Sequence, residues 1–208
     1  MPLNDFKFDR MRLLSEFFYW AKPNWSATQN YIQSFGFTTS EKYVNDDIAD
    51  CSRFQGISTP DKQGIRRMPD GTLDASITKW PRVLQNSYMK EIGDTISNFL
   101  EIPEYRVRGS IYRTSNEKYI YPFHIDSHTP YRVHLALITK KDINWLFKDQ
   151  FDEIEIHQPA NGVPTLIDTA KIKHSLYLPP NSLRVHIWYQ YYEPIKQEIL
   201  EQIGGISC

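Results

Sequence analysis

The feature that most constrains the fold of this 208-residue chain is a change in hydrophobic spacing near residue 104. Beyond it, apolar and polar side chains alternate in short runs. Such alternation is typical of half-buried strands, because successive side chains point to opposite faces of a sheet. Asn, Asp, Gly and Pro separate the runs, and Asn161-Gly162 is the clearest hairpin signal. Seven or eight such strands predict a β-sandwich or jelly roll. The expected strands are 105–113, 116–124, 131–139, 143–147, 153–157, 164–168, 174–178 and 183–191.

The first hundred residues follow a different pattern. Apolar side chains at helical spacing predict helices over Arg10 to Trp20 and over Asn86 to Leu100, each stopped by a nearby proline. Residues 36–82 predict long irregular loops, and 194–203 predict a short C-terminal helix. We therefore expect one domain over residues 1–208. It comprises a helical and loop-rich part (1–103), a β-rich core (104–192) and a C-terminal helix (193–208).

Composition excludes several function classes. Lys plus Arg is 24 and Asp plus Glu is 25, and this balance makes a nucleic-acid partner or an anionic membrane surface unexpected. The N-terminus has no signal-like apolar run and no stretch suits a membrane span, so we expect a cytoplasmic protein; its oligomeric state stays open. Two cysteines exclude a disulfide framework and a cysteine zinc site. Six histidines remain for metal binding.

Two of these histidines and one aspartate have the spacing of a metal centre. His124 and Asp126 end a predicted strand, and residues i and i+2 of a strand share a face. His174 opens another strand fifty residues later and is a candidate third ligand. Two His and one Asp would form the facial triad that holds non-haem Fe(II). His-x-Asp alone also fits a surface aspartate beside an unrelated histidine.

Two strands place cationic or polar side chains on one face. Arg184 shares its face with His186 and Trp188, and an inward arginine needs an anion because an unpaired buried charge is costly. A dicarboxylate ligand or an internal acidic side chain would supply this anion. The arginine needs no such partner if it points outward. Arg132 and His134 likewise share a face, suited to a ligand carboxylate or carbonyl or to solvent.

The order of these residues resembles the Fe(II)/2-oxoglutarate-dependent oxygenases, closest to their aspartyl/asparaginyl β-hydroxylase-like branch. The resemblance covers residues 105–192: His124-x-Asp126, then Arg132-Val133-His134-Leu135, then His174, then Arg184 ten residues later. Animal members of that branch lack the carboxylate ligand, so Asp126 makes the set closer to the ordinary triad. The implied fold is mainly β, a double-stranded β-helix (a cupin-like jelly roll) with N-terminal backing helices.

The resemblance also implies roles for individual residues. His124, Asp126 and His174 would bind Fe(II), Arg184 would pair with the distal carboxylate of 2-oxoglutarate, and Arg132 and His134 would lie against this co-substrate. No catalytic residue beyond the metal centre is implied, and O₂ is the oxidant.

Several other side chains are candidates for further roles. Arg108, Tyr112 and Trp188 are candidate substrate contacts. His186 would support neighbouring groups, His157 is expected at the surface, and His128 in a loop is an alternative ligand.

The implied activity is hydroxylation of an aspartyl, asparaginyl or prolyl residue, or of a free amino acid. Two alternatives stay open. One is a cupin-type metalloenzyme that does not use 2-oxoglutarate, against which the position of Arg184 argues. The other is a non-catalytic β-sandwich binding module, which ligand atoms of His124, Asp126 and His174 within about 4 Å of one another would exclude.

Overall fold

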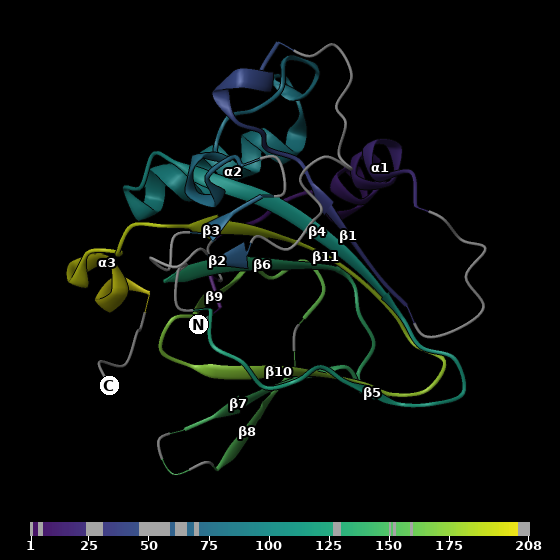
Figure 1. The fold of residues 1–208 in the computed structure, drawn as a ribbon. Helices are drawn as coiled ribbons and strands as arrows, with labels where there is room; N and C mark the ends of the chain where they lie inside the picture. Colours follow the sequence, from purple (N-terminus) through teal and green to yellow (C-terminus); the bar gives the residue numbers. More distant parts are fainter. Residues whose placement is uncertain are drawn as a thin grey trace.

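The protein is mainly β, with two antiparallel sheets and few helices (Figure 1). This computed structural model describes residues 2–3, 6–23, 31–45, 59–60, 66–68, 71–126, 130–149, 151, 153–158 and 160–203. The larger sheet has the strand order β1-β4-β11-β6-β9, and its strands are β1 (Tyr31–Gly36), β4 (Tyr105–Arg113), β11 (Leu183–Tyr191), β6 (Tyr131–Ile138) and β9 (Thr165–Asp168). The smaller sheet has the order β5-β10-β7-β8, and its strands are β5 (Tyr119–Ile120), β10 (Lys173–Leu178), β7 (Asn144–Lys148) and β8 (Ile154–His157). A separate two-stranded ribbon pairs β2 (Thr59–Pro60) with β3 (Arg66–Arg67).

Two helices lie on the larger sheet and a third follows it; they are α1 (Arg10–Ala21), α2 (Tyr88–Leu100) and α3 (Gln197–Gln202). The Asp9 carboxylate caps the start of α1 and the Ser87 hydroxyl caps the start of α2, each accepting hydrogen bonds from backbone N–H groups that the helix leaves unpaired. In the part of the chain that the structure describes, no helix is long and apolar enough to cross a membrane.

The main hydrophobic core lies between these helices and the outer face of the larger sheet. Odd-numbered residues of β4, β6 and β11, among them Val107, Val133 and Ile187, are buried there. Phe17 of α1 and Ile96 of α2 pack against them. In Figure 1, α1 and α2 accordingly lie above the larger sheet, while the smaller sheet lies below it.

The inner face of the larger sheet is instead largely polar. Its even-numbered residues face the smaller sheet, as the contact between the rings of His134 and Trp145 shows. A second, smaller hydrophobic cluster closes part of the space between the sheets and contains Ile167 and Trp145. The same face of the larger sheet carries Arg106, Arg108, Ser110, Tyr112, Arg132, His134, Arg184, His186, Trp188 and Gln190. A strand face rich in arginine and histidine, turned inward, is an arrangement expected of a ligand site rather than of a core.

The alternation that predicts the strands is confirmed, with three differences. Only Tyr119–Ile120 of the 116–124 segment forms a strand, and Pro122, which has no N–H to donate, interrupts the rest. Asn161-Gly162 is not a hairpin turn. Gly162 takes a positive φ of 78° as a turn requires, but the flanking strands β8 and β9 belong to different sheets. The third difference is that β1 and the β2–β3 ribbon form where the sequence predicts no strand, and β1 pairs with β4 at the edge of the larger sheet.

Candidate metal centre and adjoining pocket

Three potential ligands from two parts of the chain meet beside β10. His124 follows β5 and forms a backbone bridge with His174, with N–O distances of 3.0 and 2.9 Å. This pairing places the centres of the two histidine rings 4.3 Å apart. Asp126, two residues later, is fixed by a backbone hydrogen bond from its N–H to the Thr169 carbonyl. One ligand atom from each of His124, Asp126 and His174 lies within 4.8 Å of the others. The three groups therefore come together, over a somewhat wider span than the expected separation of about 4 Å.

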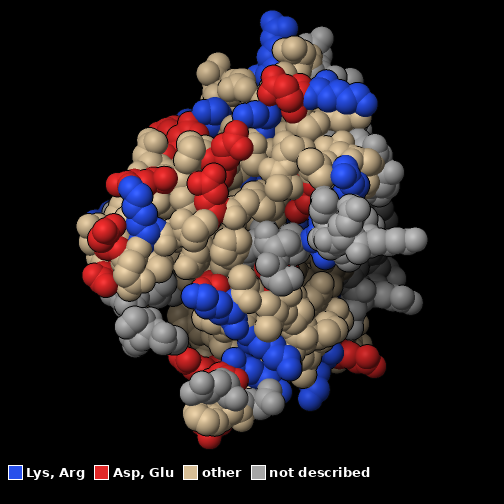
Figure 2. All heavy atoms as spheres, turned by 60° about the vertical axis from the view of Figure 1, so that its left-hand side comes forward, with Lys and Arg blue, Asp and Glu red and all other residues tan. Residues whose placement is uncertain are grey.

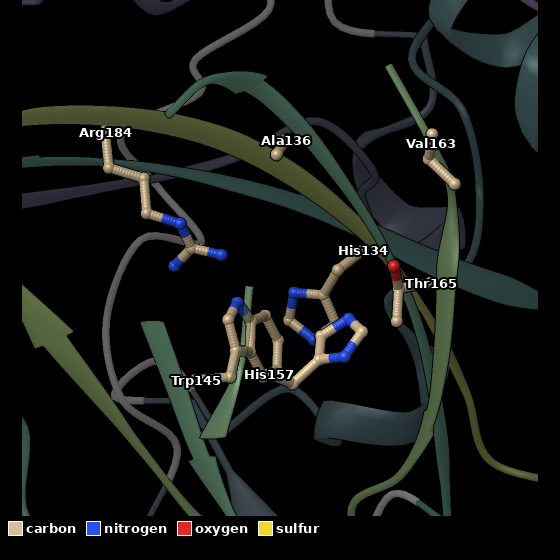
Figure 3. A pocket seen from close by; sticks show the side chains of 7 residues that line it. All are labelled: His134, Ala136, Trp145, His157, Val163, Thr165 and Arg184. Atoms are coloured by element: carbon tan, nitrogen blue, oxygen red, sulfur yellow. The ribbon is translucent and has the colours of Figure 1, made fainter. Parts of the chain in front are cut away.

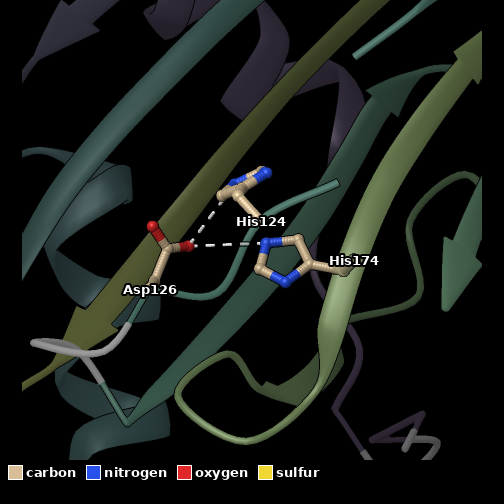
Figure 4. A group of neighbouring side chains, drawn as sticks. All are labelled: His124, Asp126 and His174. Carbon is tan, nitrogen blue, oxygen red and sulfur yellow. Dashed lines mark ion pairs between the residues drawn. The ribbon is translucent and has the colours of Figure 1, made fainter. Parts of the chain in front are cut away.

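The hydrogen bonds of both histidines orient the same ring nitrogen toward Asp126. Nδ1 of His124 lies 2.9 Å from the Pro122 carbonyl, and Nδ1 of His174 lies 2.9 Å from the Ile172 carbonyl. A carbonyl only accepts, so each Nδ1 donates to its carbonyl and each Nε2 is left facing Asp126. The two Nε2 atoms lie 3.9 and 3.4 Å from Asp126 Oδ2 (Figure 4). Metal-binding histidines commonly show this support of the other ring nitrogen by a carbonyl.

The three residues fit a first-row transition metal. At metal–ligand distances of about 2.1 Å, adjacent ligand atoms around the ion lie roughly 3 Å apart. The two separations to Asp126 exceed this value by less than an ångström. Two imidazoles with one carboxylate are a donor set suited to Fe(II) and its neighbours rather than to Mg²⁺.

Asp126 is ionised and already has a cationic neighbour. Arg132 Nη1 lies 2.5 Å from Asp126 Oδ2, in ion-pair contact but without the alignment of a hydrogen bond. Burial alone would raise the pKa of the Asp126 carboxyl. The contact with His174 and the charge of Arg132 outweigh burial and hold this pKa well below its usual range. Arg132, expected beside an anionic co-substrate, thus contacts the proposed metal ligand.

A pocket opens between the sheets beyond His134 (Figure 3). Arg184 extends into it from β11, and its guanidinium lies 5.1 Å from the centre of the Trp145 ring. Only 2% of Arg184 is exposed, yet its Nε and Nη2 have no hydrogen-bond partner. Burial lowers the pKa of Arg184 to about 10, so the side chain is still a cation at neutral pH. The pocket is lined by His134, Ala136, Trp145, His157, Val163, Thr165 and Arg184.

Two buried histidines on the inner face are neutral. His134 has neither ring nitrogen hydrogen-bonded, and His186 lacks a partner for Nδ1. Burial, together with nearby positive charge, lowers the pKa of both rings well below 6.5. They can therefore donate to or accept from a ligand without adding charge.

The three predicted substrate contacts lie on this same face. Tyr112 stacks on His186 with ring centres 5.4 Å apart, and the Arg108 guanidinium lies 5.4 Å from the Trp188 ring. Burial, reinforced by the charges of Arg106 and Arg132, lowers the pKa of Arg108 to about 9. These positions make the inner face basic as well as aromatic.

Lysines also lie on the smaller sheet beside the metal-ligand candidates. Lys148 Nζ is 5.0 Å from the centre of the Phe123 ring, next to His124, and Lys173 precedes His174. Figure 2 shows Lys and Arg side chains gathered on the lower part of the molecule, at the height of the smaller sheet in Figure 1. Such a local field attracts anions although the formal net charge is −1.

His157 departs from the sequence expectation. The sequence predicts a surface position, but His157 is half-buried and lines the pocket, whereas Ile154 and Ile156 of the same strand are 52% and 65% exposed. The apolar residues of β8 therefore face solvent, which reverses the usual pattern. His128 lies outside the described residues.

No family model and no curated protein matches the chain. Among solved structures it is similar to an oxidoreductase of the 2OG-Fe(II) oxygenase family from Burkholderia pseudomallei, with 16% identity, 54% of each chain covered and a TM-score of 0.39. It is also similar to a prolyl-4-hydroxylase from Pseudomonas putida, with 15% identity, 51% of this chain and 62% of that chain covered, and a TM-score of 0.38. A bsmA homolog from Methylobium petroleophilum PM1 matches with 9% identity, 89% of this chain and 84% of that chain covered, and a TM-score of 0.45. The chain thus spans less than two thirds of the first two proteins, and TM-scores below 0.5 establish neither its fold nor its activity.

Proposed function

We propose that this protein is an Fe(II)- and 2-oxoglutarate-dependent oxygenase that hydroxylates an aspartyl, asparaginyl or prolyl residue, or a free amino acid. The observation that carries the proposal is the convergence of His124, Asp126 and His174, with Nε2 of both histidines less than 4 Å from the same Asp126 oxygen. Such a set leaves three coordination positions for co-substrate and O₂. The bound iron would couple decarboxylation of 2-oxoglutarate, to succinate and CO₂, to hydroxylation of a substrate C–H bond.

The remaining roles belong to side chains of the inner face. Arg184 supplies the buried cation that one carboxylate of 2-oxoglutarate requires, since it has no carboxylate partner among the residues that the structure describes. Neutral His134 and cationic Arg132 lie between Arg184 and the ligand triad and would position the keto-acid end. Arg108, Tyr112 and Trp188 would contact the substrate from the same wall.

The order of the strands supports a double-stranded β-helix, the cupin-like jelly roll. From β4 to β11 the chain passes repeatedly between the two sheets, with β4, β6, β9 and β11 in the larger sheet and β5, β7, β8 and β10 in the smaller. In such a fold, ligands of a central metal come from neighbouring strands of one sheet. His124 and His174 meet this condition through their backbone bridge.

Two alternatives are weaker. A cupin-type enzyme without 2-oxoglutarate would leave the Arg184 cation buried with nothing to pair with it. A non-catalytic binding module would give no reason for two histidines to share one ring orientation and one carboxylate neighbour.

Metal binding followed by turnover tests the proposal. We expect the purified, chelator-treated protein to bind one Mn(II) or Fe(II) per chain by calorimetry and to form succinate from 2-oxoglutarate with Fe(II) and O₂. Asp126→Ala and His174→Ala should abolish both metal binding and succinate formation. Arg184→Ala should keep the metal but raise the KM for 2-oxoglutarate strongly. Amino acids and peptides containing Asp, Asn or Pro are screened for stimulation of succinate formation.

The matched control is Asp142→Ala, which removes an exposed carboxylate before β7 and should bind metal like the wild type. Bound metal without binding or consumption of 2-oxoglutarate would favour the cupin-type alternative. Equal metal binding by wild type, Asp126→Ala and His174→Ala would show that the site is misassigned.

A further inference from the structure

Trp145 carries a buried hydrogen-bond donor that nothing in the described structure satisfies. It lies on β7 opposite Leu176 of β10, on the face of the smaller sheet that looks toward the larger one. Its side chain is 5% exposed, and its Nε1 has no hydrogen-bond partner. A buried donor left without an acceptor costs about 1–3 kcal/mol, so such groups in native proteins usually meet a ligand or water.

Arg184 brings a second unsatisfied donor to the same place. Its guanidinium lies over the Trp145 ring, and Figure 3 shows the indole nitrogen on the side of the ring nearest that guanidinium. An indole N–H and a guanidinium both donate only, so neither can satisfy the other. Both need an acceptor placed between them, and the fixed charge of Arg184 makes an anion the favoured acceptor.

The walls around these donors restrict what that anion is. The neutral His134 ring stands edge-on to Trp145 with ring centres 4.4 Å apart, and Val163 and Thr165 also line the pocket. A carboxylate has two oxygens in one plane and can offer one to each donor. A carboxamide offers one oxygen and turns an NH₂ group toward the other donor.

We propose that Trp145 Nε1–H and the Arg184 guanidinium together bind one carboxylate, and that Trp145 makes the pocket selective for a carboxylate over its amide. This inference rests on the proposed function for the identity of the ligand, the distal carboxylate of 2-oxoglutarate. The requirement for a carboxylate comes from the two donors themselves. Trp145 is thus a specificity residue in the co-substrate pocket.

Trp145→Phe tests the proposal, because it keeps an aromatic ring beneath Arg184 and removes only the N–H. With Zn(II)-loaded protein, calorimetry should show 2-oxoglutarate binding weakened about tenfold or more, as expected for loss of a hydrogen bond to a charged group. The preference of the wild type for 2-oxoglutarate over 2-oxoglutaramate, its distal amide, should shrink by a similar factor. Trp20→Phe, which removes an indole N–H from α1 on the other side of the larger sheet, should bind both compounds like the wild type.

A second measurement uses the wild-type protein alone and does not depend on the variant folding. In ¹H–¹⁵N spectra of the Zn(II) form, the assigned Trp145 indole N–H signal should move downfield when 2-oxoglutarate is added. The same signal should move less with 2-oxoglutaramate. Wild-type binding of 2-oxoglutarate with an unmoved Trp145 signal, or with a Trp145→Phe affinity equal to wild type, would overturn the role of Trp145 and leave the oxygenase proposal intact. Failure of the wild type to bind 2-oxoglutarate at all would instead overturn the proposed function.

Discussion

At the scale of single residues, burial determines which side chains of the interior carry charge. Arg184 is still charged because its ordinary pKa lies far above neutral, so burial lowers the pKa only to about 10. His134 and His186 start from 6.5 and become neutral under the same burial. The space between the sheets therefore combines fixed cations with uncharged rings, an arrangement that suits an anionic ligand with several oxygen atoms.

The neutral histidines make the fold sensitive to acid. Below pH 6.5 the unfolded chain takes up a proton at each of these two residues and the folded chain does not, so stability falls as the pH falls. Each buried histidine contributes up to about 1.4 kcal/mol per pH unit in this range. His186→Phe keeps a ring stacked on Tyr112 and removes one titrating group. It should therefore reduce the change in the free energy of unfolding per pH unit by about that amount. Urea denaturation of the metal-free protein at pH 7.5, 6.5 and 5.5 measures this pH dependence. Equal pH dependence of the unfolding free energy in wild type and variant would contradict a neutral, buried His186.

At the scale of secondary-structure elements, the approach of α2 to the larger sheet depends on a helical glycine. A Cβ added at Gly93 would lie 2.6 Å from the Tyr105 hydroxyl and 2.7 Å from Tyr189 Cε1. Both tyrosines are also hydrogen-bonded to the helix, Tyr105 to Asp94 at 2.6 Å and Tyr189 to the Met89 carbonyl at 2.8 Å. They cannot move aside without breaking these bonds, so the glycine sets the spacing between helix and sheet.

Gly93→Ala should therefore destabilise the protein, although alanine favours a helix more than glycine does. Propensity alone predicts stabilisation by about 1 kcal/mol in the middle of a helix. Overpacking against two buried rings should instead destabilise the protein by about 1–3 kcal/mol. Chemical denaturation measures the difference, with Thr95→Ala on the exposed side of α2 as the control. A Gly93→Ala variant more stable than wild type would show that the helix can shift at little cost.

At the scale of the whole molecule, a buried ion pair ties the N-terminal half to the β-rich half. Asp74, in a short 3₁₀ turn, pairs with Arg106 of β4, and both side chains are almost fully buried. The Tyr192 hydroxyl lies 3.2 Å from the same carboxylate, just after β11. The irregular segment before α2 is thereby held against the end of the sandwich by charge rather than by apolar packing alone.

A double-mutant cycle measures this link. Removing one partner of a buried pair typically costs about 3–5 kcal/mol, so we expect Asp74→Asn and Arg106→Gln each to be strongly destabilising. The double variant should lose much less than the sum of the two. The exposed pair of Lys79 and Glu104, 2.8 Å apart, is the control and should show a coupling below about 1 kcal/mol. A coupling for Asp74 and Arg106 as small as that of the control would refute the link.

How much of the fold and of the candidate site could be predicted from the sequence depends on how far apart in the chain the interacting residues lie. The strands of the β-rich half follow from alternation, which is a local signal. His124 and Asp126 do meet, but Asp126 lies outside the strands, so its position depends on the hydrogen bond from its N–H to the distant Thr169 carbonyl and not on strand spacing. The partnership of Arg132 with Asp126 and that of Asp74 with Arg106 join segments whose relative placement no local pattern encodes. The half-burial of His157 could not be predicted either, because it depends on the pairing of β8 with β7 at the edge of the smaller sheet, which leaves Ile154 and Ile156 exposed.

The alternation of β4, β6 and β11 has a consequence for how this protein can evolve. Odd-numbered positions of these strands pack toward α1 and α2, while even-numbered positions face the smaller sheet and the proposed ligand site. Substitutions at neighbouring positions therefore meet different selective pressures, one for folding and one for chemistry. A lineage can exchange the inward side chains to accept a new substrate while the outward set keeps the domain folded. Descendants of such a chain would diverge in every second residue of the same strands.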